Sequence, residues 1–248
     1  MGQISKRLRV ILAIVGLAVC SACSTKTPDH FDTLIQDGTL YDGSGNTPYV
    51  GDLGIIGDRI VALGNLDNAT ADKVINAKGK AVSPGFINMI GWGVTSLITD
   101  GRGLSDITQG ITLEVFGEGN SMGPLSPVMK TEFPKYWAGI NPSWTTLGEY
   151  LEFLETKGVA PNIASFIGAT TPRIHVLGQD DVDPTPQQLK LMQELVREAM
   201  REGAVGVASS LIYTPASFAE TDELVALAKA AAEYGGIYAS HLRNEGKQ

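Results

Sequence analysis

The sequence predicts an α/β protein with a parallel sheet, preceded by a small all-β segment. From residue 84 onward, short apolar strands alternate with amphipathic helices, as in folds with right-handed crossovers between parallel strands. Before residue 84, short strands follow one another with turn residues between them and without a helix-length periodic run. The alternation shows about five strands, and it agrees with both a doubly wound sheet and an eight-stranded α/β barrel.

The first 23 residues have the layout of an export signal. A cluster of cations at residues 6–9 precedes an apolar run over residues 10–19 that is too short to span a bilayer. Small residues then lead to Cys23, which fits a lipidation site better than Cys20 because Val19 is bulky. We therefore expect an exported lipoprotein, anchored to a membrane through Cys23 and located in the periplasm or at the cell surface. A simple cleaved signal peptide is the alternative.

The composition limits the classes of partner and the kinds of site. Hydrophobic residues make up 43% of the chain, charged residues 19%, and the net charge is −8. No nucleic-acid partner is expected, since phosphate neutralisation needs clustered Lys and Arg. Both cysteines lie within residues 1–23, so removal of that segment leaves no thiol beyond a lipidated Cys23. A disulfide or a thiolate zinc site is therefore excluded from the body of the protein.

Residues 24–83 are predicted to form a polar tether followed by a small β unit. A Gly57-Asp58 pair separates two apolar runs, which is typical of a tight hairpin. The clearest predicted strands are Asp32–Leu40, Val50–Ile56, Arg59–Leu63 and Lys80–Val82.

Residues 84–248 are predicted to alternate between strands and helices. Thr146 with Glu149, and Thr185 with Gln188, have the spacing of capping boxes at two helix starts. Gly101-Arg102-Gly103 lacks the third glycine of a dinucleotide-binding loop. The predicted strands are 86–89, 111–116, 162–167, 204–212 and 237–241, and the predicted helices are 146–157, 185–202 and 221–234.

Four segments carry a family resemblance in the same order along the chain. They are Pro-Gly-Phe-Ile-Asn at 84–88, Gln-Gly-Ile-Thr-Leu-Glu-Val at 109–115, Gly-Ala-Val-Gly-Val-Ala-Ser at 203–209 and the block Tyr238–Gly246. These segments resemble the N-acyl-D-amino-acid deacylases (D-aminoacylases) of the amidohydrolase superfamily. The resemblance implies an incomplete (β/α)8 TIM barrel over residues 84–248, preceded by a small β-sandwich segment. It also implies that the chain is the N-terminal part of a longer enzyme.

The resemblance further implies a hydrolase of linear amide C–N bonds that uses zinc or another divalent metal. His241 matches a family metal ligand, and imidazole suits zinc. A cysteine ligand of the family is missing, and Glu118 is our candidate replacement, with Glu114 as a competing carboxylate. The family's His-x-His pair falls on Ile90 and Trp92, which cannot bind a metal.

The substrate implied by the resemblance is an N-acylated amino acid or a similar amide. Tyr213 matches an aromatic position of the substrate pocket, and Arg243 is a candidate for binding the substrate carboxylate. Glu245 could orient a ligand, and Arg173 could face the same mouth. The general base and the family's second metal histidine are expected beyond Gln248, so we expect this chain alone to be inactive.

Two other functions remain open at this point. One is a related amidohydrolase, such as a dipeptidase or a cyclic-amide hydrolase, because the substrate cannot be read from these residues. The other is a non-catalytic lipoprotein that keeps the barrel as a binding domain. Ile90 and Trp92 favour the non-catalytic alternative, whereas Glu118 and His241 oppose it.

Overall fold

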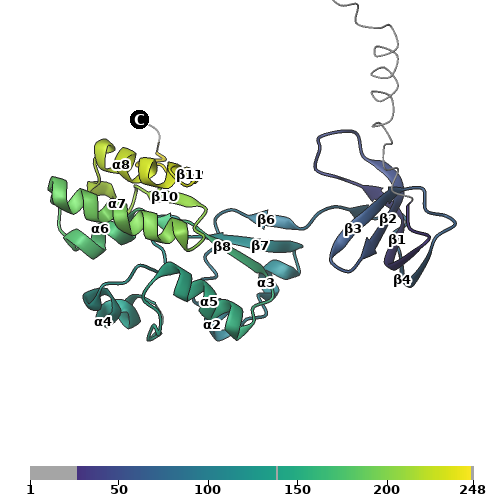
Figure 1. Cartoon of the computed structure of the whole chain (residues 1–248), viewed down its shortest axis with the longest axis horizontal. Helices are drawn as coiled ribbons and strands as arrows, with labels where there is room; N and C mark the ends of the chain where they lie inside the picture. The colour runs from purple at the N-terminus through teal and green to yellow at the C-terminus, as the bar shows by residue number, and fades with distance from the viewer. Residues whose placement is uncertain (1–26, 138, 247–248) are drawn as a thin grey trace, which may run out of the picture. The chain divides into compact units, whose positions relative to one another are not determined.

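The computed structural model describes residues 27–137 and 139–246, and these form two compact units that divide between Pro84 and Gly85 (Figure 1). The predicted export signal and Cys23 lie outside the described residues. None of the helices in the described ranges is both long and apolar enough to cross a membrane.

The first unit is a five-stranded β-sheet. Strand β1 lies between β2 and β4, β3 pairs with the outer side of β2, and β5 extends the pairing of β1. The β1–β2 and β2–β3 pairs are antiparallel, whereas β4 and β5 run parallel to β1. The strands are β1 (His30–Leu40), β2 (Tyr49–Ile56), β3 (Arg59–Gly64), β4 (Thr70–Asn76) and β5 (Ala81–Val82).

The predicted strands of this unit are confirmed, but β4 was missed. Its sequence, Thr-Ala-Asp-Lys-Val-Ile-Asn, lacks the apolar alternation of a half-buried strand, and most of its residues are exposed. The predicted hairpin turn is present at Gly57, where φ is +58°. Phe31 and Leu34 of β1 form the small core with Leu66, and the Phe31 ring lies directly over Gly54.

The second unit contains six short strands whose paired neighbours all run parallel. They form two three-stranded sheets, β6-β7-β8 and β9-β10-β11. A single residue, Phe166, separates β8 from β9, and its N–H donates to the Phe116 carbonyl oxygen at 2.8 Å. The strands are β6 (Phe86–Asn88), β7 (Ile111–Phe116), β8 (Asn162–Ser165), β9 (Ile167–Gly168), β10 (Gly206–Ser210) and β11 (Ile237–His241).

Helices separate these strands in the chain, except between β8 and β9. The three long helices predicted from the sequence are confirmed. Both capping boxes are present: the Thr146 hydroxyl accepts from Glu149 N–H at 3.2 Å, and the Thr185 hydroxyl accepts from Gln188 N–H at 3.3 Å. The helices are α2 (Ser96–Thr99), α3 (Leu104–Ile107), α4 (Pro127–Tyr136), α5 (Leu147–Lys157), α6 (Thr170–Leu177), α7 (Pro186–Arg201) and α8 (Thr221–Ala232), with a 3-10 turn at Ala216–Phe218.

Two apolar layers lie on opposite faces of the parallel strands. Phe116, Ile167 and Val207 pack with side chains of the helices, among them Leu147 and Met192. Their neighbours in the sequence face the opposite side of the strands, where Val115, Phe166 and Ala208 form a smaller cluster. This alternation follows from the two-residue period of a strand, and it places the helices against one face of the sheet.

Arg173 lies inside the helix layer, so the expectation that it faces the mouth of the site was wrong. Its Nη1 is 2.5 Å from Glu223 Oε2 of α8, and its Nη2 donates to the Val182 carbonyl oxygen at 2.7 Å. Both charged side chains are almost completely buried. Burial raises the pKa of the Glu223 carboxyl, although the neighbouring Arg173 guanidinium acts in the opposite direction.

Candidate metal site

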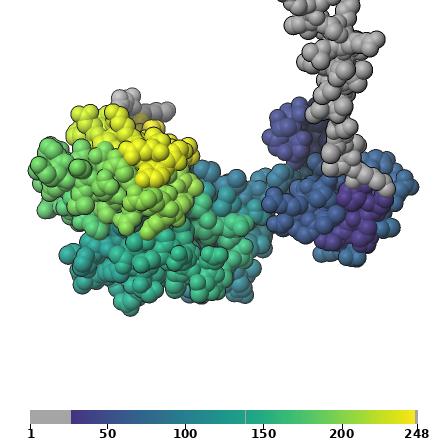
Figure 2. All heavy atoms as spheres, viewed as in Figure 1, coloured from purple at the N-terminus to yellow at the C-terminus, as the bar shows by residue number. Residues whose placement is uncertain are grey.

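The carboxyl ends of the parallel strands supply the polar side chains of one cavity. His241 is the last residue of β11, Ser210 ends β10, and Glu118 follows β7 by two residues. The cavity, called here the metal-site cavity, has a volume of about 540 Å³. It is lined by Ile90, Trp92, Glu118, Asn120, Thr170, Ser210, Tyr213, Thr214, Ala216 and His241. Figure 2 shows the C-terminal segment, in yellow, at the surface of the second unit.

His241 and Glu118 approach each other across this cavity. His241 Nδ1 lies 3.3 Å from Glu118 Oε1, and the two side chains are only 25% and 14% exposed. On the other side of the ring, His241 Nε2 lies 3.0 Å from Oε1 of the more exposed Glu245. The Tyr213 ring meets the imidazole edge-on, with 5.9 Å between the ring centroids. The structure therefore brings together the predicted ligands His241 and Glu118 with the predicted pocket residue Tyr213.

The position of Glu118 depends on the glycine before it. Gly117 has a φ of +92°, a conformation that residues with a Cβ rarely adopt. A Cβ on Gly117 would lie 2.1 Å from the Phe166 carbonyl oxygen, far inside contact distance. The close approach of the Phe166 backbone thus requires glycine at the turn that directs Glu118 into the cavity.

The separation of the two ligand atoms suits a metal ion. A tetrahedral zinc with bonds of about 2.0–2.2 Å holds neighbouring ligand atoms about 3.3–3.6 Å apart. The distance of 3.3 Å between His241 Nδ1 and Glu118 Oε1 agrees with this spacing. Within residues 27–137 and 139–246, however, no group of three or more His, Cys, Asp or Glu side chains is placed to share a metal. His241 and Glu118 therefore fit two of the four positions around a zinc ion.

Arg243 has a different place from the other predicted site residues. Its Nη1 donates to the Ser217 carbonyl oxygen at 2.8 Å, and its Nη2 donates to the Ala219 carbonyl oxygen at 2.5 Å. Arg243 thereby links the segment after β11 to the 3-10 turn that follows Tyr213, and it is not among the residues that line the cavity.

Two lining residues that the sequence did not reveal carry unpaired hydroxyl groups. Thr170 Oγ1 and Ser210 Oγ are buried, and neither has a hydrogen-bond partner among the described residues. Buried polar atoms without partners are uncommon in native structures and are often explained by a bound ligand or water. Their position next to strand ends was the available signal, but serine and threonine are too common for this signal to single them out.

Glu114 of β7 does not line this cavity, and its carboxylate lies next to Gly91 and Gly93, which follow β6. It is buried, and its Oε1 has no hydrogen-bond partner in the described part of the chain. A Cβ on either Gly91 or Gly93 would lie 2.9 Å from Glu114 Oε2. Burial, followed by the charge of Asp106, raises the pKa of this carboxyl.

Glu114→Gln is expected to change how stability depends on pH. Because the folded-state pKa is raised, folding favours the protonated acid, and wild-type stability falls as pH rises from about 4.3, the unfolded value, through the folded pKa. The amide does not ionise, so the variant gains stability relative to wild type above this window, by about 1.4 kcal/mol for each unit of pKa elevation. Thermal unfolding at pH 4 and pH 8 measures the difference. Equal differences at both values would contradict the expectation.

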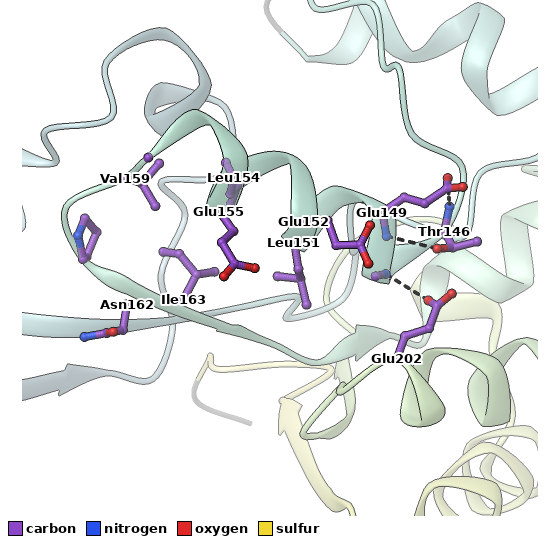
Figure 3. Close-up of a pocket in the computed structure, with 13 residues that line it drawn as sticks. Thr146, Glu149, Leu151, Glu152, Leu154, Glu155, Val159, Asn162, Ile163 and Glu202 are labelled. Carbon is purple, nitrogen blue, oxygen red and sulfur yellow. Dashed lines mark hydrogen bonds between the residues drawn. The ribbon is translucent and has the colours of Figure 1, made fainter.

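A further cavity, of about 710 Å³, lies along α5 (Figure 3). Glu149 and Glu202 direct their carboxylates at the start of this helix, where Glu202 Oε2 accepts from Gly148 N–H at 2.9 Å. Anionic groups at a helix N-terminus are stabilising. Glu149 and Glu202 therefore act as helix caps, and His241 and Glu118 remain the candidate metal ligands.

Comparison with known proteins gives several relatives with one activity, although no protein-family model matches the chain. The D-aminoacylase of Alcaligenes xylosoxydans xylosoxydans is 33% identical over 219 residues, which are 88% of this chain and 45% of that protein. A crystal structure of a D-aminoacylase, described as defining a subset of amidohydrolases, superposes with a TM-score of 0.77 at 31% identity. Over 88% of its length the chain is similar to the N-acyl-D-amino-acid deacylases.

A second family structure comes from Bordetella bronchiseptica. This N-acyl-D-glutamate deacylase, in complex with zinc and a phosphonate that mimics the tetrahedral intermediate, gives a TM-score of 0.75 at 29% identity. Each of the two family structures matches 87–88% of this chain and 46% of its own length. The chain therefore spans less than half the length of the family members it matches.

Proposed function

We propose that the protein carrying this chain is a metal-dependent hydrolase of N-acyl-D-amino acids. The observation that carries the proposal is the pair His241 and Glu118, which lie 3.3 Å apart at the carboxyl ends of parallel strands. Similarity to known proteins suggests the substrate class, since the relatives are named as D-aminoacylase and N-acyl-D-glutamate deacylase. Zinc is the metal present in the N-acyl-D-glutamate deacylase structure.

His241 and Glu118 would hold the zinc, together with donors from outside the described residues. The bound metal would supply Lewis acidity and a more acidic water. Glu245, 3.0 Å from His241 Nε2, orients the imidazole as a carboxylate partner commonly does for a metal-bound histidine. Thr170 and Ser210 offer their unpaired hydroxyls to a polar group of the substrate, and Tyr213 closes one side of the cavity. No general base is assigned among the described residues.

We also propose that β6 to β11 are part of a (β/α)8 TIM barrel and that the first unit is part of a β-sandwich. Three features support the barrel over a doubly wound sheet. The strands follow one another in chain order, every pair is parallel, and the helices pack against one face. The opposite face carries a mixture of apolar side chains, among them Val115, Phe166 and Ala208, which agrees with the packed interior of a barrel.

The test of the proposed activity is an assay of the zinc-loaded protein with N-acetyl-D-methionine, N-acetyl-D-glutamate and their L-enantiomers. We expect hydrolysis of at least one D-substrate, loss of activity after chelation and recovery with zinc. Turnover of dipeptides or cyclic amides in place of these substrates would favour a related amidohydrolase instead.

One observation favours a second function, a barrel that binds ligands without catalysis. Ile90 and Trp92 line the metal-site cavity at the positions where the family resemblance places two histidines. A protein that contains no zinc after purification with added zinc, and hydrolyses none of the tested amides, would support this function.

We propose in addition that the protein is exported and lipid-anchored at Cys23, on the basis of its signal sequence. Cys23→Ser is expected to shift the protein from the membrane fraction to the soluble or unprocessed fraction, because the modified thiol is lost. Fractionation after labelling with radioactive palmitate measures this shift, with Cys20→Ser as the matched control. Unchanged membrane association and labelling of the Cys23 variant would contradict lipidation at this position.

A further inference from the structure

A second cavity adjoins the metal-site cavity and opens between α4 and α6. Its volume is about 690 Å³. The two cavities share Asn120 and Thr214 as lining residues, so they lie side by side. A volume of this size is typical of pockets that bury most of a small organic ligand.

The walls of the second cavity are largely apolar. Met129 and Phe133 of α4 line it, as does Trp137 directly after this helix, and Ile174 and Leu177 line it from α6. The Phe133 and Trp137 rings stack with 5.8 Å between their centroids, so two aromatic side chains adjoin at this wall.

The Glu132 and His175 side chains of this cavity already have partners. Glu132 is paired with Lys135 at 2.7 Å, and His175 Nδ1 lies 3.3 Å from the Pro124 carbonyl oxygen. No Lys or Arg of the described residues lines either cavity. The second cavity can therefore hold an apolar group, and it has no lysine or arginine side chain that would bind an anion.

We propose that the second cavity, called here the acyl cavity, receives the acyl chain of the substrate and selects medium-length or aryl acyl groups over acetyl. This inference rests on the proposed function and names the acyl class that the same site accepts. An acetyl group has two carbons and fills only a small part of 690 Å³. A longer acyl chain would contact the apolar side chains that line the cavity and exclude water from them.

The charge of the substrate favours the acyl chain over the amino-acid side chain as the occupant. The side chain and the carboxylate of an amino acid leave the same carbon atom. A cavity that receives the side chain therefore holds the carboxylate at its entrance, where it needs a cation. The acyl chain leaves the uncharged carbonyl carbon, which matches an entrance formed by Asn120 and Thr214 and walls without Lys or Arg.

The experiment compares N-acetyl-, N-butanoyl- and N-octanoyl-D-methionine as substrates of the zinc-loaded protein. Octanoyl has four more methylenes than butanoyl, and each methylene that becomes buried strengthens binding by about fourfold. Burial of two or three of the four is expected to raise kcat/KM by about ten- to a hundredfold. Equal or falling kcat/KM with chain length, in a protein that hydrolyses N-acetyl-D-methionine, would overturn the acyl cavity and leave the proposed function standing.

Two variants locate the preference in this cavity. Val128 lines the cavity from α4 and is 72% exposed, so Val128→Glu should fold and should place a charge beside the chain. The matched control is Val225→Glu on α8, an exposed valine that lines neither cavity. We expect Val128→Glu to lower the ratio of octanoyl to acetyl kcat/KM at least threefold relative to Val225→Glu. If both variants prefer octanoyl over acetyl to the same extent, the acyl chain does not bind in this cavity.

A binding measurement tests the cavity independently of catalysis. Octanamide and acetamide, which are uncharged like the acyl part of the substrate, are titrated into the zinc-free protein, and tryptophan fluorescence is recorded, since Trp137 lines the cavity. Octanamide should change the fluorescence with at least tenfold higher affinity than acetamide, and Val128→Glu should weaken octanamide binding more than Val225→Glu does. If octanamide binds in this way but no amide is hydrolysed, the acyl cavity stands and the proposed activity fails. If octanamide does not bind, the acyl cavity is wrong.

Discussion

His241→Ala is expected to abolish both zinc binding and amide hydrolysis. The imidazole is one of two candidate ligands, and it lies 3.3 Å from the other, Glu118. Removal of a residue that merely orients a metal ligand costs about 10- to 100-fold in affinity or activity. Loss of the ligand itself should exceed this, so we expect less than about 1% of wild-type kcat/KM. Zinc content measured by atomic emission, alongside the hydrolysis assay, checks both effects.

His30→Ala is the matched control for this variant. His30 is an exposed histidine of β1 that pairs with Asp72 and Thr70, within the first unit. The control should retain zinc and activity. Zinc content that falls equally in both variants would indicate that histidine in general, rather than His241, holds the metal under the assay conditions.

Substitutions at residue 118 refine the same prediction. Glu118→Gln keeps the size of the side chain but removes its charge, so zinc affinity should fall. Glu118→Cys introduces the ligand type that the family resemblance places here, and a thiolate binds zinc well. We expect the cysteine variant to retain more zinc than the glutamine variant. Equal retention by all three proteins would show that residue 118 does not bind the metal.

Separation of the buried pair Arg173–Glu223 is expected to produce the largest loss of stability. The two side chains are 1% and 3% exposed, and Arg173 Nη1 lies 2.5 Å from Glu223 Oε2. Removal of one member of such a pair leaves an uncompensated buried charge, which costs about 3–5 kcal/mol. Arg173→Met should therefore lower the free energy of unfolding by about this amount, as measured by urea denaturation at pH 7.

The dependence on pH and a second variant make this prediction specific. Burial already raises the pKa of Glu223, and loss of Arg173 removes the interaction that lowers it. When the folded-state pKa of a carboxyl is raised, the free energy of unfolding of the protein falls as pH rises. The Arg173→Met variant should therefore be less destabilised near pH 4 than at pH 7. Arg173→Met combined with Glu223→Leu should recover much of the lost stability. A double variant as unstable as the single one, with no dependence on pH, would contradict a charge effect.

Much of the secondary structure could be predicted because it depends on local pattern. The helices α5 and α7 begin at capping boxes and keep apolar residues at helical spacing, so few residues determine them. In contrast, α4 contains Pro134, and α6 starts with Thr-Thr-Pro, sequences that do not favour a helix. Strand β4 is polar and exposed, and its pairing with β1 comes from the tertiary fold. These elements depend on distant contacts that a local pattern does not contain.

The candidate site divides in the same way. His241 and Glu118 could be proposed from the strand ends and the family resemblance, although their separation in the chain left open whether they meet. Arg243 looked like a carboxylate-binding group, yet its guanidinium is occupied by two backbone carbonyls. Arg173 looked accessible, yet it is paired with a carboxylate fifty residues away. An arginine's role depends on the acceptors near it, and a single sequence does not identify these.

Gly117 has a consequence for engineering this site. The backbone at Gly117, confined by the Phe166 carbonyl oxygen, determines where the next side chain points. The identity of residue 118 can therefore be exchanged among metal-binding types while the direction of the side chain is kept. Libraries that vary residue 118 and retain residue 117 would sample different metal preferences on one scaffold. If residues 117 and 118 are varied together, most variants would no longer direct the side chain of residue 118 into the cavity.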